Sequence, residues 1–142
     1  MSALPPELYR RLAGLADAWQ ARHWRELKRE TGVNPRLTVD ALCFSPCPQR
    51  PGWLVGAWLT PKCLSLAMVG ESVSAHDEES VMLSLPSGRY RLRREAVSAD
   101  DSVWLCPLLE DLSDLDGHDD ACRLAQRLMA SVMTEPGQAP MG

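Results

Sequence analysis

The sequence predicts an α+β fold: an antiparallel sheet of five to six strands with an N-terminal and a C-terminal helix packed on one face. Helical periodicity is confined to the two ends of the chain, the segments between them alternate in polarity, and their links are as short as those of hairpins. A chain of 142 residues buries roughly 70% of its unfolded surface in one core. We therefore expect a single domain over residues 1–142, with a frayed tail from about residue 134.

The N-terminal helix is expected to begin at Pro5 and Pro6, because proline is favoured in a first helical turn. Gly32 is the expected stop. One side of this helix is mostly basic, as is common for a solvated face. Apolar residues recur on the other side at helical spacing: Leu8, Leu12, Leu15, Trp19 and Leu27.

The stretch 52–69 holds two of the five tryptophans and predicts two strands. Both faces of the first strand are apolar, which suits the middle of a sheet. Residues of opposite parity point to opposite faces, so we expect one of Trp53 and Trp58 in the core under the helices and the other on an exposed apolar surface. Thr60 and Pro61 end this strand, and the next one begins at Leu64.

The remaining segments predict the rest of the sheet and the second helix. A first strand over 37–44 precedes a proline-rich loop, and a last strand over 103–106 is expected to end at Pro107. Between them, Pro86 to Gly88 form the turn of a hairpin that carries three arginines on one face. The C-terminal helix has an apolar face made of Ala121, Leu124, Ala125, Leu128, Met129 and Val132.

Composition argues against several classes of protein. A net charge of -4 and a pI near 5.3 disfavour a nucleic-acid binder, and no apolar run reaches the roughly 18 residues of a membrane span. The start of the chain lacks the pattern of a secretory signal, so we expect a cytoplasmic protein. No nucleophile motif, phosphate loop or metal-ligand motif is present, so we expect no enzyme and assign no catalytic residue, metal or cofactor.

Two competing interpretations remain open. Cys43, Cys47, Cys63 and Cys106 would serve a thiol-dependent metal-binding or redox accessory protein, although structural zinc sites usually use tight cysteine pairs. A nucleic-acid binder would use Arg89, Arg91, Arg93 and the basic helix face. Bound metal or a low-pKa thiol would support the first, and steeply salt-dependent binding to DNA or RNA would support the second.

A pattern spread over most of the chain resembles the HybE/HupJ family of nickel-iron hydrogenase assembly chaperones. It includes the motif N-P-x-L-x-V-x-A-x-x-F from Asn34 to Phe44, the strand end L-T-P at residues 59–61, and P-S-G at residues 86–88. The family usually follows T-P with an aromatic residue and M-N-L, where this chain has Lys62 to Leu66. It also tends to show S-L-x-S-P-M where this chain reads P-L-L-E-D after Cys106. These departures fall at positions that would contact a client protein, so they bear on which client this chain binds.

The resemblance implies a cytoplasmic proofreading chaperone that binds the small-subunit precursor of a nickel-iron hydrogenase, including its twin-arginine signal peptide. Export would be delayed until the iron-sulfur clusters are in place and the large subunit has docked. The large subunit and other hydrogenase accessory proteins are further candidate partners, and no nucleic acid, membrane or cofactor is expected.

A receptor for two arginines followed by an apolar run needs an apolar surface with carboxylates nearby. The candidate client-binding residues are therefore the apolar Trp53, Trp58, Pro61 and Leu64, and the acidic Glu110, Asp111, Asp114 and Asp116. The competing interpretation of these acids is a solvated loop before a helix, whose dipole favours negative charge at that end.

Overall fold

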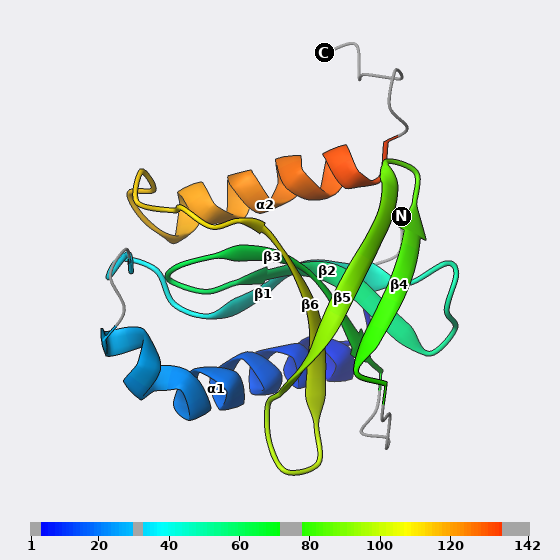
Figure 1. Ribbon diagram of the computed structural model, residues 1–142, viewed down its shortest axis with the longest axis horizontal. Coiled ribbons are helices and arrows are strands. Elements are labelled where there is room, and N and C mark those ends of the chain that lie inside the picture. Colours follow the sequence, from blue (N-terminus) through cyan, green and yellow to red (C-terminus); the bar gives the residue numbers. More distant parts are fainter. Residues whose placement is uncertain (1–3, 30–32, 72–77, 135–142) are drawn as a thin grey trace.

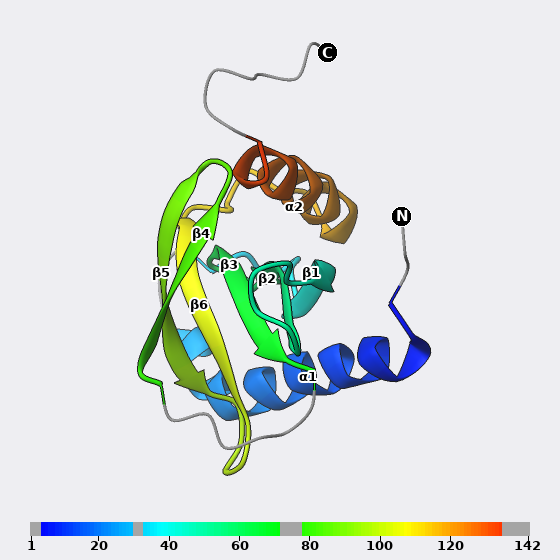
Figure 2. The same ribbon diagram turned by 90° about the vertical axis from the view of Figure 1, so that its right-hand side faces the viewer.

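The computed structural model describes residues 4–29, 33–71 and 78–134 (Figures 1 and 2). Its elements are α1 (Pro6–Arg29), β1 (Asp40–Pro46), β2 (Trp53–Leu59), β3 (Leu64–Gly70), β4 (Ser80–Leu85), β5 (Gly88–Ala96), β6 (Ser102–Leu109) and α2 (His118–Val132). The strands form one antiparallel sheet in the order β1-β2-β3-β6-β5-β4. The predicted α+β class, with a helix at each end of the chain, is confirmed. The expected helix stop at Gly32 and the tail beyond residue 134 lie outside the described residues.

The two helices lie on opposite faces of the sheet, with α1 on one side and α2 on the other (Figures 1 and 2). The prediction that both pack on one face is therefore wrong. Alternate residues of β2 show why: Val55 packs in the cluster that contains α2, whereas Leu54 packs in the cluster that contains α1. A central strand that is apolar on both faces needs a cover on each side, and each helix supplies one.

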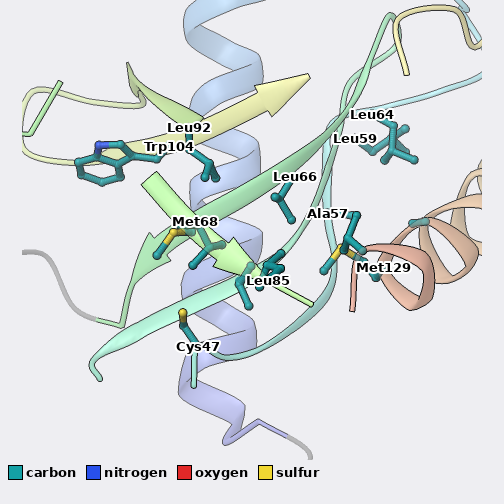
Figure 3. Packing of buried hydrophobic residues seen from close by; sticks show 14 of the residues in the cluster. Cys47, Ala57, Leu59, Leu64, Leu66, Met68, Leu85, Leu92, Trp104 and Met129 are labelled. Carbon is teal, nitrogen blue, oxygen red and sulfur yellow. The ribbon is translucent and has the colours of Figure 1, made fainter. Parts of the chain in front are cut away.

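The core on the α2 side is the larger of the two and gathers residues from most of the sheet (Figure 3). Leu66, Met68 and Leu92 are fully buried there, and the rings of Trp53 and Trp104 meet edge to face at 4.9 Å. The helix α2 contributes Ala121, Ala125, Met129 and Val132. The apolar face predicted for the C-terminal helix is thus the face of α2 that packs against the sheet.

The core on the α1 side is built around Trp58, whose ring meets Trp19 of α1 edge to face at 6.4 Å. Gly56 of β2 allows the edge strand to approach closely here, because a Cβ at this position would lie 2.5 Å from the ring of Phe44 and 2.8 Å from its Cα. The remaining contacts come from α1, β3 and β6, with Leu12, Leu15, Leu27, Ala67, Val69, Val103 and Leu105 buried.

Both tryptophans of β2 are buried, since Trp53 is 4% exposed and Trp58 is 0% exposed. The prediction that one of them lies on an exposed apolar surface is wrong. Parity does place them on opposite faces, but helices cover both faces of β2, so each face is core.

The bounds of two strands also differ from those predicted: β1 begins at Asp40 and not at residue 37, and both β1 and β6 run past their expected ends. β1 runs on to Pro46, which pairs with Leu54 after a bulge near Cys43, and a proline is tolerated there because β1 is an edge strand. β6 continues through Pro107, which pairs with Ser65 of β3. The pairing of β5 with β6 ends at Leu105, so this part of β6 has a ladder partner on one side only.

Candidate functional site

A hollow of about 590 Å³ opens between the C-terminal half of α1 and the sheet. Four parts of the chain that are distant in sequence meet around it. We call it the acidic hollow, and its lining residues are Trp19, His23, Glu26, Leu27, Thr60, Lys62, Cys63, Ser65, Glu95, Leu105, Pro107 and Glu110.

Strand parity and one tight turn place the side chains of this hollow. Glu95 pairs with Val103, a residue of the α1-side core, so its carboxylate stands on the face that α1 covers in part. The β2–β3 turn is held by Thr60, whose Oγ1 accepts hydrogen bonds from the amides of Lys62 at 3.3 Å and Cys63 at 3.0 Å. The turn therefore presents the side chains of residues 62 and 63 in a defined position.

Negative charge predominates in the acidic hollow. Glu26, Glu95 and Glu110 line it, against the single ammonium group of Lys62. Burial raises the pKa of the Cys63 thiol, and the nearby carboxylates of Glu110 and Glu95 raise it further, although the hydrogen bond between Cys63 and Ser65 lowers it. Three carboxylates around one cavity favour a cationic ligand.

The floor of the acidic hollow is aromatic and carries unpaired polar atoms. Trp19 stacks on His23 with ring centroids 4.2 Å apart, and His23 Nδ1 lies 3.5 Å from a carboxylate oxygen of Glu26. Among the described residues, Nε1 of Trp19 and Nε2 of His23 are buried without a hydrogen-bond partner. Unpaired buried polar groups are costly in a folded protein, because the hydrogen bonds that they made to water are not replaced.

A second hollow of about 440 Å³ lies on the other side of the same end of α1. We call it the apolar groove. Leu27 lines both hollows, and the β2–β3 turn contributes Pro61 to the groove and Thr60 and Lys62 to the acidic hollow. Trp24 is 45% exposed at its rim, with Lys28 Nζ 5.0 Å from the ring centroid. Its other lining residues are Gln20, Val33, Asn34, Pro35, Leu37 and Thr38.

The structure separates the apolar residues that the sequence predicted as one site. Pro61 is buried but lines the apolar groove, whereas Leu64 and Trp58 are fully buried in the core and Trp53 is only 4% exposed. In this conformation the last three are core residues whose side chains are closed to a client. The surface of the two hollows comes instead from α1, the β2–β3 turn, residues between 33 and 38, and residues of β3, β5 and β6 together with Glu110.

The predicted acidic residues are separated in the same way. Glu110 lines the acidic hollow, whereas Asp111, Asp114 and Asp116 line neither hollow. These three residues lie on the exposed segment that follows β6, which we call the acidic segment. Asp116 lies 3.5 Å from Arg36. Asp111 accepts hydrogen bonds from the amide and hydroxyl of Ser113, which lower the pKa of its carboxyl. These two carboxylates are therefore engaged locally.

The motif N-P has a clear structural role beside the site. The Asn34 side chain donates hydrogen bonds to the carbonyl oxygens of Leu112 and Leu115, both at 2.9 Å, and its Oδ1 accepts one from the Arg36 amide. Its backbone N–H bonds to the Pro61 carbonyl at 2.8 Å. This one residue fixes the acidic segment and the β2–β3 turn relative to each other.

Sequence reasoning missed Glu26, Glu95 and Trp24. Two of them interrupt a pattern: Glu26 is an acid on a mostly basic helix face, and Glu95 ends a strand face that otherwise carries arginines. Trp24 stands on the solvated side of α1, where a large indole is unusual. Residues that depart from the pattern of their neighbours, as these three do, were the signal in the sequence that could have identified them as site residues.

The thiols do not form a metal centre in the part of the chain that the structure describes, where no group of three or more potential ligands comes together. Burial raises the pKa of Cys43, Cys63, Cys106 and Cys122, which lowers the thiolate fraction at neutral pH. Neither described helix has an apolar stretch long enough to cross a bilayer.

Comparison with known protein families matches residues 10–141 to the family described as NiFe-hydrogenase assembly chaperone, HybE. Searches of curated proteins and of solved structures gave no significant match. The family match spans nearly the whole chain, including most of α1, all six strands and α2. It agrees with the resemblance carried by the N-P, L-T-P and P-S-G motifs. The chain therefore belongs to the HybE family of nickel-iron hydrogenase assembly chaperones.

Proposed function

We propose that this chaperone acts in the cytoplasm on the small-subunit precursor of a nickel-iron hydrogenase and binds its twin-arginine signal peptide. Binding would delay export until the clusters are loaded and the large subunit has docked. The observation that carries the proposal is the adjacency of the acidic hollow and the apolar groove, which share Leu27 and the β2–β3 turn. A signal peptide has the same two parts in sequence, a pair of arginines and an apolar run.

The chemistry of each hollow suits one part of that peptide. Guanidinium groups form charge-assisted hydrogen bonds with carboxylates, and Glu26, Glu95 and Glu110 supply three of these in one cavity. The exposed ring of Trp24 and the rings of Pro35 and Pro61 provide the apolar contact for the following segment.

This function requires recognition and no bond-breaking chemistry. The proposal therefore treats the protein as a binding module and not an enzyme, and it needs no cofactor. The large subunit and other hydrogenase accessory proteins are proposed as later partners, because delayed export is useful only if another protein completes the assembly.

The test is a titration of a twin-arginine signal peptide into the folded protein. The hollow variant carries Glu26→Gln, Glu95→Gln and Glu110→Gln. We expect its affinity to fall by about tenfold, because exposed or half-exposed ion pairs contribute about 0.2 to 1 kcal/mol each. Peptides with both arginines replaced by glutamine should lose affinity for the wild-type protein and show little difference between the two proteins.

A matched control separates the hollow from the acidic segment. The control variant carries Asp111→Asn, Asp114→Asn and Asp116→Asn, which removes the same number of charges from residues outside both hollows. If the arginines are bound in the hollow, this variant should lose only the weak, salt-sensitive part of the attraction. A larger loss in the control than in the hollow variant would move the arginine contacts to the acidic segment, as the sequence first suggested.

The groove has its own test. Trp24→Ala should weaken binding of the complete signal peptide several-fold, with little effect on a truncated peptide that ends after the arginines. Equal weakening of both peptides would contradict the division of labour between the two hollows. Failure of the signal peptide to bind wild-type protein at any salt concentration would overturn the proposed function itself.

A further inference from the structure

The strand β4 forms one edge of the sheet, and its outward backbone groups can be identified from its pairing with β5. Glu79 accepts a hydrogen bond from the amide of Arg94 at 2.9 Å, immediately before the first paired residue of β4. Hydrogen-bonded and non-hydrogen-bonded pairs alternate along an antiparallel ladder. The backbone groups of residues 81, 83 and 85 therefore face β5, and those of Ser80, Met82 and Ser84 point to the open edge.

This edge lacks the devices that usually protect an edge strand. The sequence of β4, S-V-M-L-S-L, contains no charge and no proline. Ser80, Met82 and Ser84 are exposed, with Met82 at 47%, and no backbone hydrogen bond joins them to another described residue on the open side. An uncharged edge of this kind is a template for a further strand.

A row of arginines stands beside this edge on one face of the sheet. Arg89, Arg91 and Arg93 of β5 pair with Ser84, Met82 and Ser80, and all three arginines are exposed. None of them has an ion pair with a residue in the described ranges. Their side chains repeat every second residue, which is about 6.8 Å along a strand. We call them the arginine row.

We propose that the β4 edge binds an extended segment of a partner protein as a seventh strand, and that carboxylates at alternate positions of that segment face the arginine row. The added backbone would pair with the outward groups of Ser80, Met82 and Ser84. Its side chains would lie two strands from β5, at about 9.6 Å, a separation that an arginine and a glutamate side chain bridge together. Side chains on one face of a bound strand repeat every second residue, as the arginines of the row do, so carboxylates at alternate positions can face the arginines along the strand.

Charge selects this occupant over the alternatives. A second copy of the chain pairing through its own β4 would bring no carboxylate to that face, because β4 carries none. A phosphate-rich nucleic acid would satisfy the arginines but not the backbone edge, and the chain as a whole carries a net charge of -4. An extended segment with carboxylates at alternate positions can pair with the backbone groups of the β4 edge and can also form ion pairs with the arginine row.

This surface differs from the acidic hollow in the sign of the ligand it takes. Glu95 continues the same face of β5 beyond Arg93 but belongs to the hollow, so the charge reverses within two residues. A peptide rich in glutamate should bind at the β4 edge and not compete with a twin-arginine peptide at the hollow. A negative result for peptide binding at the β4 edge would thus leave the proposal for the acidic hollow unchanged, and a negative result at the hollow would leave the proposal for the edge unchanged.

The test uses a short capped peptide in which glutamate alternates with valine or threonine, titrated by fluorescence anisotropy. The controls have the same composition with the glutamates made consecutive, and the same sequence with glutamine or lysine in place of glutamate. We expect the alternating glutamate peptide to bind most tightly and to increase protection from amide hydrogen exchange at Met82 and Ser84. Equal binding of the consecutive and alternating peptides, or no added protection in β4, would overturn strand addition.

Two variants separate charge from backbone pairing. The combined change Arg89→Gln, Arg91→Gln and Arg93→Gln should weaken the alternating peptide by about tenfold, as expected for three exposed ion pairs. Met82→Pro removes an outward N–H while leaving the bonds to β5, so it should abolish binding, whereas the matched Met82→Val should retain it. Retained signal-peptide binding and an unchanged circular dichroism spectrum would show that each variant is folded.

Four outcomes count against the proposal. Undiminished binding by the folded Met82→Pro variant would exclude the edge, and undiminished binding by the arginine variant would exclude the row. Tighter binding of a DNA oligonucleotide than of the peptide, lost in the arginine variant, would assign the row to nucleic acid. Self-association through β4 would appear as a dimer in sedimentation that the acidic peptide fails to dissociate.

Discussion

The two faces of the sheet in this chaperone differ in how completely they are covered. On the α2 side, Trp104 donates its indole N–H to the Glu78 carbonyl at 2.8 Å, and the cluster reaches from the first strand to the last helix. On the α1 side, the indole nitrogens of Trp19 and Trp58 and Nε2 of His23 lack partners among the described residues. The acidic hollow and the apolar groove both lie on this second side.

This difference indicates a division of roles between the faces. The α2 side stabilises the fold, because it buries apolar surface and leaves few polar atoms unsatisfied. The α1 side has the smaller core, and Glu26, Glu95 and Glu110 line the acidic hollow beside it. Substitutions on the two sides should therefore affect different measurements.

The largest effect is expected from Leu92→Ala, which removes a fully buried side chain from the α2-side core. The free energy of unfolding should fall by about 2 to 5 kcal/mol, since a cavity remains after a buried leucine is truncated. Urea denaturation followed by tryptophan fluorescence measures it. The folded fraction should bind the signal peptide with unchanged affinity, and a large loss of affinity would break the division of roles.

A smaller loss of stability is expected from Gly56→Ala on the α1 side. The new Cβ would lie 2.8 Å from the Cα of Phe44, so the edge strand must shift away from β2. Overpacking of this kind costs about 1 to 3 kcal/mol. Phe44→Ala in the same chain should relieve the 2.5 Å clash with the ring, although not the one with the Cα, so the double variant should be destabilised by less than the sum of the two single variants. Additive effects would contradict the close approach.

The glutamates of the acidic hollow should show the opposite behaviour. The hollow variant with Glu26, Glu95 and Glu110 changed to glutamine should keep its stability within about 0.5 kcal/mol or gain slightly, because mutual repulsion is removed. Its thermal midpoint at low and at high salt is the measurement. A strong loss of stability would show that these carboxylates support the fold, and the comparison between the faces would need revision.

The smallest effect concerns the reactivity of Cys63 in the hollow. Burial raises its pKa, so the thiolate fraction at pH 7 is below that of a free cysteine and increases as the pH rises. Alkylation by iodoacetamide should be slow at pH 7, accelerate at higher pH, and slow again when the signal peptide is bound. Peptide mapping by mass spectrometry reports the site. Rapid alkylation at pH 7 would support the thiol-dependent alternative.

Local patterns in the sequence were sufficient for the elements and for much of the core. The two strands of the stretch 52–69, the P-S-G turn at residues 86–88 and the apolar face of α2 all appear in the structure as predicted. These features depend on neighbours within a few residues, and backbone geometry makes their periods independent of the rest of the chain. The family motif around Asn34 was also visible, although its hydrogen bonds to residues 112 and 115 were not.

Only the tertiary structure decided which helix covers which face and which acids share a cavity. Parity states that Trp53 and Trp58 point in opposite directions, but it does not state what lies on either side. Glu26, Glu95 and Glu110 come from a helix, a strand and a loop, and the packing of α1 against the sheet brings them to one hollow. Contacts between residues so far apart in sequence depend on the whole fold, and no local period records them.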